Sequence, residues 1–127
     1  MTIPLMTIPG IADFTSDELD TVREIVEERY GKPVQLDLAD SELRLDPSSP
    51  ELTSCPTIYW EERGAAFVIF KVGEGRYRCQ FFYSVKEQFG TGIEEYSDLA
   101  QCTMTLLQVQ ADHEADRQGV FPGKRSQ

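Results

Sequence analysis

Residues 57–84 have the sequence TIYWEERGAAFVIFKVGEGRYRCQFFYS, the segment of the chain that is richest in aromatic residues. It contains three runs rich in aromatic and β-branched residues, separated by Arg63-Gly64 and by the Gly-Glu-Gly sequence at residues 73–75. Runs of this composition are typical of β-strands, and glycines between such runs are typical of tight turns. The stretch therefore predicts a meander of three antiparallel strands.

The second turn also predicts how the last two strands pair. A two-residue loop at Glu74-Gly75 would place apolar residues opposite one another on one face. The pairs would be Val72 with Tyr77, Phe70 with Cys79, Val68 with Phe81 and Ala66 with Tyr83. A shift by one residue would place Phe70 opposite Arg78, which is unfavourable on a buried face. We therefore expect the face that contains Phe70 to be the core face.

The other face of this meander would carry Phe67, Ile69 and Phe82, together with Arg76 and Arg78. Aromatic residues and arginine are enriched at protein–protein interfaces. If both helices pack on the core face, these five residues form an exposed surface for a protein partner. If one helix covers each face, they belong to the core instead.

The segment before the meander predicts a helix followed by a hairpin. Thr15 or Ser16 caps the helix, with Glu18 positioned for a capping box, and Gly31 ends it. Residues 34–38 and 43–45 alternate between apolar and polar side chains, as half-buried strands do. Residues 39–42 would form the turn that connects these two strands.

A second helix is predicted from Ser97-Asp98, which can cap it, to about Arg117. Its apolar residues cover more than half of the helix circumference, whereas packing on one sheet face needs an arc of roughly 100°. The excess fits either deep burial beside the first helix or contact with a second copy of the chain. A homodimer is therefore one expected state.

These elements predict an α+β fold with two layers. An N-terminal helix, an antiparallel sheet of about five strands (the hairpin plus the meander) and a C-terminal helix follow one another. At 127 residues, the chain has the length of one domain. We expect a single domain over residues 1–127, with an extended lead at residues 1–12 and a polar tail at residues 120–127.

The charge is strongly acidic and excludes several classes of partner. The net charge is −10, and the excess lies within residues 1–62. Nucleic acids and anionic membranes would repel such a protein, and no apolar run approaches the length of a membrane span. The N-terminus lacks the basic region of a signal peptide. Three widely spaced cysteines form neither a disulfide framework nor a zinc pattern, so we expect a reduced, cytoplasmic protein in which Cys55 alone is accessible.

The sequence indicates no catalytic site. His113 is the only histidine and lies near the end of the second helix, next to Asp112 and Glu114. A serine or cysteine nucleophile would need it as a base. Gly90-Thr91-Gly92 is not positioned between a strand and a helix as phosphate-binding loops are. We therefore expect a protein that is not an enzyme.

The acidic half could instead bind a divalent cation. Calcium prefers six to eight oxygen ligands and accepts irregular geometry. The predicted hairpin gathers four carboxylates, and the start of the first helix has three more. The first set is Asp37, Asp40, Glu42 and Asp46, and the second choice is Asp13, Asp17 and Asp20. The spacing does not match an EF-hand loop.

The order of elements, with an acidic first helix and first strands, is similar to that of frataxins. That resemblance implies an acidic surface used for iron, and it assigns no role to any individual residue of this chain. Acidic secretion chaperones and immunity proteins are similar in size and composition. Two hypotheses follow: a calcium-binding buffer or regulator, or a protein-interaction module that binds a basic or apolar partner.

Overall fold

The computed structural model describes residues 10–117, and these form two helices and five strands. The elements are α1 (Ser16–Tyr30), β1 (Asp37–Leu43), β2 (Thr53–Glu62), β3 (Ala65–Gly73), β4 (Arg76–Ser84), β5 (Glu87–Phe89) and α2 (Leu99–Arg117). The strands lie in the order β1-β2-β3-β4-β5, and each neighbouring pair is antiparallel. The predicted α+β class is confirmed. The predicted tail and most of the predicted lead lie outside the described residues.

Helix α1 begins and ends where the sequence predicts. The Thr15 hydroxyl accepts a hydrogen bond from the Glu18 amide at 3.1 Å, and the Glu18 carboxylate accepts one from the Thr15 amide at 2.8 Å. These two bonds form a capping box. At the other end, Gly31 has a φ of 69°, a left-handed conformation that glycine adopts without steric cost.

The predicted hairpin at residues 34–45 is wrong. Residues 39–42 do not turn but form the middle of β1, which pairs along its length with β2 from Asp37–Tyr59 to Leu43–Thr53. A short hairpin is marginal on its own, whereas the ten-residue β2 offers β1 a long partner. The turn occurs instead in the Pro- and Ser-rich segment that follows β1. The fifth strand is β5, which the sequence pattern did not predict.

The predicted register of β3 and β4 is also wrong by one residue. Phe70 lies opposite Arg78, and Ile69 lies opposite Cys79. The register shifts between Lys71 and Gly73, where β3 contains one residue more than β4. Such a bulge exchanges the two faces of a strand relative to a regular hairpin. Phe67 and Ile69 therefore face the core, and Phe70 lies on the opposite face.

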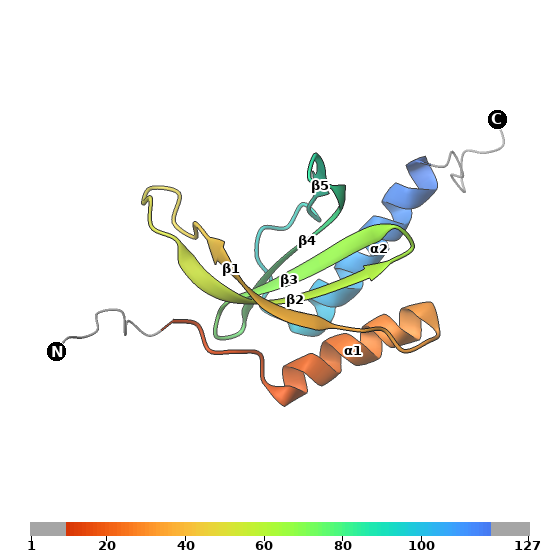
Figure 1. The fold of residues 1–127 in the computed structure, drawn as a ribbon, viewed down its shortest axis with the longest axis horizontal. Coiled ribbons are helices and arrows are strands. Elements are labelled where there is room, and N and C mark those ends of the chain that lie inside the picture. Colours follow the sequence, from red (N-terminus) through yellow and green to blue (C-terminus); the bar gives the residue numbers. More distant parts are fainter. Residues whose placement is uncertain (1–9, 118–127) are drawn as a thin grey trace.

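Both helices pack on one face of the sheet, and the core lies between them and that face (Figure 1). In Figure 1, α2 passes behind the sheet and α1 lies below it. Val22 and Val26 of α1 and Leu106 of α2 are fully buried there. On the sheet side, Trp60 stacks on Phe67 with ring centroids 5.1 Å apart.

One charged residue, Lys71, lies on this core face and is 1% exposed. Its Nζ donates hydrogen bonds to the carbonyl oxygen of Asp13 at 3.0 Å and to Oε1 of Glu18 at 2.9 Å. The hydroxyl of Tyr77 donates to the other oxygen of Glu18. A lysine can occupy this face because a carboxylate and a carbonyl oxygen satisfy its charge and its hydrogen bonds.

Candidate functional site

The sheet face opposite the helices is the candidate site, and we call it the open face. Within residues 10–117, no helix packs on it. Three cross-strand rows form its centre, because the registers of β2, β3 and β4 align their side chains. The rows are Glu61–Ala66–Phe82, Tyr59–Val68–Gln80 and Thr57–Phe70–Arg78. Most of these side chains are apolar or aromatic.

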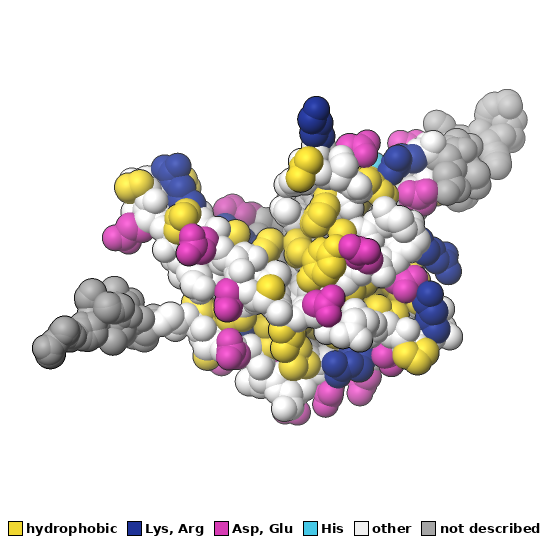
Figure 2. Space-filling view, in the orientation of Figure 1, with side chains coloured by type: hydrophobic (Ala, Val, Ile, Leu, Met, Phe, Trp, Pro, Cys, Tyr) yellow, Lys and Arg dark blue, Asp and Glu magenta, His cyan; other side chains and the backbone are white. Residues whose placement is uncertain are grey.

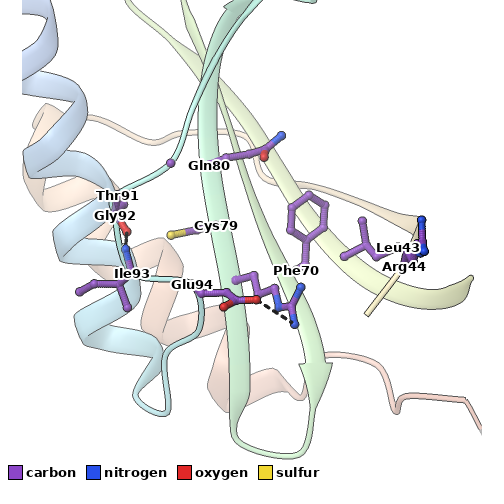
Figure 3. A pocket seen from close by; sticks show the side chains of 11 residues that line it. Leu43, Arg44, Phe70, Cys79, Gln80, Thr91, Gly92, Ile93 and Glu94 are labelled. Atoms are coloured by element: carbon purple, nitrogen blue, oxygen red, sulfur yellow. Dashed lines mark hydrogen bonds and ion pairs between the residues drawn. The ribbon is translucent and has the colours of Figure 1, made fainter. Parts of the chain in front are cut away.

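The first hollow on the open face has a volume of about 440 Å³. Phe70 and Gln80 lie at its base, between two walls (Figure 3). Leu43 and Arg44 form one wall, and residues 90–94, after β5, form the other. Cys79 also contributes to the lining, and in Figure 3 its side chain extends to the side of β4 on which Thr91 and Gly92 lie. The hollow therefore combines an apolar base with polar walls.

Arg44 helps to shape the first wall. Its guanidinium donates hydrogen bonds to the carbonyl oxygens of Ser49 at 2.7 Å and Pro47 at 2.6 Å. These contacts hold the loop between β1 and β2 against the end of β1. In the space-filling view, this loop and the β4–β5 turn project on either side of a depression (Figure 2). Arg44 was not among the residues predicted from the sequence.

Two arginines of β4 and two glutamates form an ion-pair cluster at the edge of the first hollow. Arg76 Nε lies 2.6 Å from Glu95, and an Arg78 terminal nitrogen lies 3.5 Å from Glu95 and 3.9 Å from Glu94. The hydrogen bond from Arg76 lowers the pKa of the Glu95 carboxyl group, so Glu95 is ionised at neutral pH. Arg78 Nε is buried and has no hydrogen-bond partner among the described residues.

The second hollow has a volume of about 460 Å³ and lies at the other end of the open face. Tyr59, Ala66 and Phe82 contribute apolar surface, and Glu61 contributes a carboxylate. The Tyr59 hydroxyl donates a hydrogen bond to Glu61, which raises the pKa of Tyr59. Acidic side chains surround exposed apolar ones on the face seen in Figure 2.

The structure separates the five predicted partner-binding residues. Phe67 and Ile69 are fully buried in the core, so their prediction as surface residues is wrong. The cause is the bulge in β3, which the two-residue turn did not predict. Phe82 is partly exposed on the open face, and Arg76 and Arg78 belong to the ion-pair cluster. A partner-binding role stays a prediction for these three residues.

The predicted metal ligands do not converge. Asp37 lies on one face of β1, whereas Asp40 and Glu42 both lie on the opposite face, because side chains alternate along a strand. Asp46 accepts hydrogen bonds from the backbone and hydroxyl of Ser48, which lower its pKa. Among residues 10–117, no group of three or more His, Cys, Asp or Glu residues is arranged to hold a metal ion.

The second-choice metal ligands also have local roles. The backbone carbonyl oxygen of Asp13 accepts a hydrogen bond from Lys71 Nζ, and that of Asp17 accepts one from the Thr21 hydroxyl. The Asp20 carboxylate pairs with Arg23 at 3.6 Å. Calcium binding stays a prediction. Asp40 and Glu42 also lie on β1, an edge strand, where charged side chains oppose pairing with another chain.

The three cysteines are free and buried. Burial of Cys79 and Cys102 confirms the prediction for these two. Cys55 was expected in an accessible loop, but it lies in β2 and is fully buried. Burial raises the pKa of the Cys55 thiol, which lowers its reactivity further. The prediction that Cys55 is accessible is therefore wrong.

Helix α2 meets both α1 and an aromatic cluster. Leu107 is 2% exposed, as expected for a helix packed deeply beside the first, whereas Met104 is 52% exposed. His113 lies 4.2 Å from Phe89, measured between ring centroids, and its Nδ1 is 3.3 Å from the hydroxyl of Tyr83. His113 therefore lies on the helix side of the sheet, away from both hollows. Self-association through α2 stays a prediction.

Comparison with known proteins adds no family to this description. None of the helices in residues 10–117 is both long and apolar enough to cross a membrane. No protein-family model, curated protein or solved structure matches the chain.

Proposed function

We propose that the protein is a non-catalytic interaction module whose open face binds an apolar segment of a partner protein flanked by basic residues. One observation carries this proposal: two hollows lie on the same uncovered sheet face. Apolar surface that is gathered in one place and bordered by charges is typical of protein-binding sites. The open face is also rich in the residue types, Tyr, Phe and Arg, that are enriched at interfaces.

The shape of the open face favours an elongated occupant. Ala66 lines the second hollow and Phe70 lines the first. These residues are four positions apart in β3, which corresponds to roughly 13 Å along a strand. Val68 lies between them on the same face but is only 8% exposed. A peptide strand or about two to three turns of a helix would span this distance.

Charge favours a basic partner. The whole protein has a net charge of −10, and charges of both signs line the hollows: Arg44, Arg78 and Glu94 in the first, and Glu61, Glu62 and Arg63 in the second. Long-range attraction to lysine and arginine would speed the encounter. The three free cysteines support a reducing compartment, such as the cytoplasm.

The polar groups around the hollows support binding rather than catalysis. Glu95 pairs with two arginines, and Glu61 accepts the Tyr59 hydroxyl. Among residues 10–117, no histidine lines either hollow, and Cys79 is the one cysteine, in the first. A nucleophile with an adjacent base is what covalent catalysis would need.

Fluorescence anisotropy with two labelled model peptides tests this proposal. One peptide contains a leucine-rich centre with lysines at both ends, and the other has glutamates in place of the lysines. We expect the lysine peptide to bind with a dissociation constant of the order of micromolar and the glutamate peptide to bind at least about tenfold more weakly. Binding should weaken as salt is added.

Two pairs of variants locate the binding site. Phe82→Ser and Phe70→Ser alter the second and first hollows, and each should weaken binding about tenfold or more. Leu38→Ser and Met104→Ser remove leucine or methionine side chains that are 60% and 52% exposed elsewhere, and they should leave binding unchanged. Equal loss in all four variants, or no binding of the lysine peptide by the wild type, would show that the open face does not have this function.

A further inference from the structure

The charges that line the first hollow do not balance. They are Arg44, Arg78 and Glu94, which leaves one positive charge in excess. Arg76 and Glu95 lie beyond the lining and pair with each other at 2.6 Å, so they do not change this sum. The excess has the opposite sign to the net charge of the whole protein, which is −10.

Arg44 carries a charge without a counter-charge. Its hydrogen bonds to Ser49 and Pro47 use Nε and Nη2, and both acceptors are neutral carbonyl oxygens. It forms no ion pair within residues 10–117. These hydrogen bonds hold the guanidinium in place, and the side chain is exposed. The charge of Arg44 and its Nη1 can therefore bind an anionic group.

Arg78, on the other side of Phe70 from Arg44, is paired only loosely. Its Nη2 lies 3.5 Å from Glu95 and 3.9 Å from Glu94, whereas a charge-assisted hydrogen bond is about 2.7–2.9 Å long. Arg76 holds Glu95 more closely, and the Glu94 side chain is 83% exposed. The Nε of Arg78 is buried without an acceptor, which is unfavourable. A better acceptor would therefore improve the contacts of this guanidinium.

The remaining lining fits the carbon stem of an acidic side chain. Phe70 lies at the base, with Leu43 and Arg44 on one side and Glu94 on the other (Figure 3). Leu43 and Phe70 provide apolar surface for methylene groups. The planar guanidinium group matches the two oxygens of a carboxylate better than an ammonium group does.

We infer that the first hollow binds the carboxylate of an aspartate or glutamate within the partner's apolar segment, through Arg44 and Arg78. This inference rests on the proposed function, because it specifies a residue of the same partner. The carboxylate neutralises the excess charge of the lining. Its oxygens accept hydrogen bonds from the two guanidinium groups.

The second hollow has no such excess. Glu61, Glu62 and Arg63 line it, and Glu62 also pairs with Lys32 at 3.2 Å. Two negative and two positive charges therefore meet there. Because only the first hollow favours a carboxylate, an acidic residue also fixes the direction in which the segment lies along the open face.

Fluorescence anisotropy with pairs of modified lysine peptides tests this inference. Each pair has one leucine of the centre replaced by glutamate or by glutamine, and the pairs cover every central position. We expect the glutamate peptide to bind about fivefold more tightly than its glutamine partner at one position. The measurement uses 150 mM salt, where the screening length of about 8 Å reduces repulsion from the net charge. Equal affinities within every pair would overturn the inference.

Three charge-removing variants locate the carboxylate. Arg44→Gln and Arg78→Gln should each reduce the preference for glutamate over glutamine to less than about twofold. Arg29→Gln is the matched control, because it removes the same charge from an exposed residue of α1, on the helix side of the sheet. It should leave the preference unchanged. A preference that persists in both Arg44→Gln and Arg78→Gln, or that Arg29→Gln reduces equally, would overturn the inference.

The outcomes separate this inference from the proposed function. If the glutamine peptides bind but glutamate gives no advantage, the open face keeps its proposed function and the inference is wrong. If no peptide binds, the proposed function fails, and a titration of the wild type with 4-phenylbutyrate and its amide decides the inference. We then expect the carboxylate, but not the amide, to shift the NMR signals of the Nε–H groups of Arg44 and Arg78. Unchanged signals would overturn the inference.

Discussion

Lys71 and Glu18 connect the start of α1 to the core face of the sheet. Glu18 caps its own helix through Thr15 and also binds Lys71 and Tyr77, so one carboxylate has three partners. The Lys71 side chain is 1% exposed and the Glu18 side chain 16% exposed. A buried ion pair of this kind contributes little relative to apolar packing, but loss of one partner leaves the other charge without compensation.

We therefore predict a strong asymmetry between single and double substitutions. Glu18→Gln should lower the free energy of unfolding by about 3 kcal/mol, because it leaves the Lys71 ammonium buried without a counter-charge. Lys71→Met in the same chain should restore most of that loss. Urea unfolding at neutral pH measures both effects, with Glu28→Gln on the exposed face of α1 as the control. A double variant as unstable as Glu18→Gln alone would contradict the prediction.

The same carboxylate predicts a pH dependence of stability. Burial raises the pKa of Glu18, but hydrogen bonds from Tyr77, the Thr15 amide and Lys71 outweigh it, so the pKa lies below the usual 4.5. Between the native pKa and 4.5, the unfolded chain binds a proton that the native protein does not. This contribution to stability is therefore complete above about pH 4.5 and is lost as the pH falls through the native pKa.

Urea unfolding from about pH 6 to about pH 3 measures this dependence. We expect wild type to lose more stability over this range than Glu18→Gln, which has no titrating group at this position. Other carboxylates titrate in both proteins and cancel in the comparison. Parallel pH profiles would show that Glu18 has the same pKa in the folded and unfolded states.

At the scale of elements, the bulge in β3 decides which residues the sheet presents to each side. Adjacent residues of β4 show the result: Phe81 is fully buried among the core residues, and Phe82 is partly exposed on the open face. The sequence pattern placed Phe81 and Phe82 correctly in β4 but exchanged the faces of β3. The misleading feature was the turn at Glu74-Gly75, because a regular two-residue hairpin there would pair Phe70 with Cys79, whereas the bulge pairs Phe70 with Arg78.

These neighbours provide a matched test of the two faces. Phe81→Ala should lower the free energy of unfolding by about 3–5 kcal/mol, because it removes a fully buried aromatic ring. Phe82→Ala should cost about 1 kcal/mol or less, as expected for a partly exposed residue with no helix above it. Urea unfolding of the two variants measures the difference. Similar losses would indicate that the open face is covered in the native protein.

At the scale of the whole molecule, the net charge of −10 opposes the compact state. The exposed face of α1 adds to this repulsion, because Glu24 and Glu28 are exposed and lie one turn apart. Salt should reduce this repulsion, since the screening length falls from about 30 Å at 10 mM to about 8 Å at 150 mM.

We predict that the melting temperature rises by a few degrees over this range of sodium chloride, because salt screens the repulsion between the carboxylates. Thermal unfolding of wild type and of a Glu24→Gln, Glu28→Gln variant measures the effect, which should be smaller in the variant. Calcium chloride at equal ionic strength provides a comparison. A further rise with calcium, lost in Asp40→Asn, would indicate the cation site predicted from the sequence. A melting temperature that falls as sodium chloride is added would contradict the prediction.

Features that depend only on neighbouring residues can be predicted from the amino-acid sequence. The capping box at Thr15, the left-handed Gly31 and the Asp98 cap of α2 all follow from contacts within a few residues. The meander and the two terminal helices follow from local periodicity in the same way.

Only the tertiary structure decided the features that depend on distant partners. Lys71 is stable in the core because Glu18, 53 residues away, supplies the counter-charge. The continuous course of β1, without a turn at residues 39–42, depends on its pairing with β2. The open face exists because both helices pack on one side, a choice that the sequence pattern left open. The candidate site belongs to this second group, because its residues come together only through the register of the sheet.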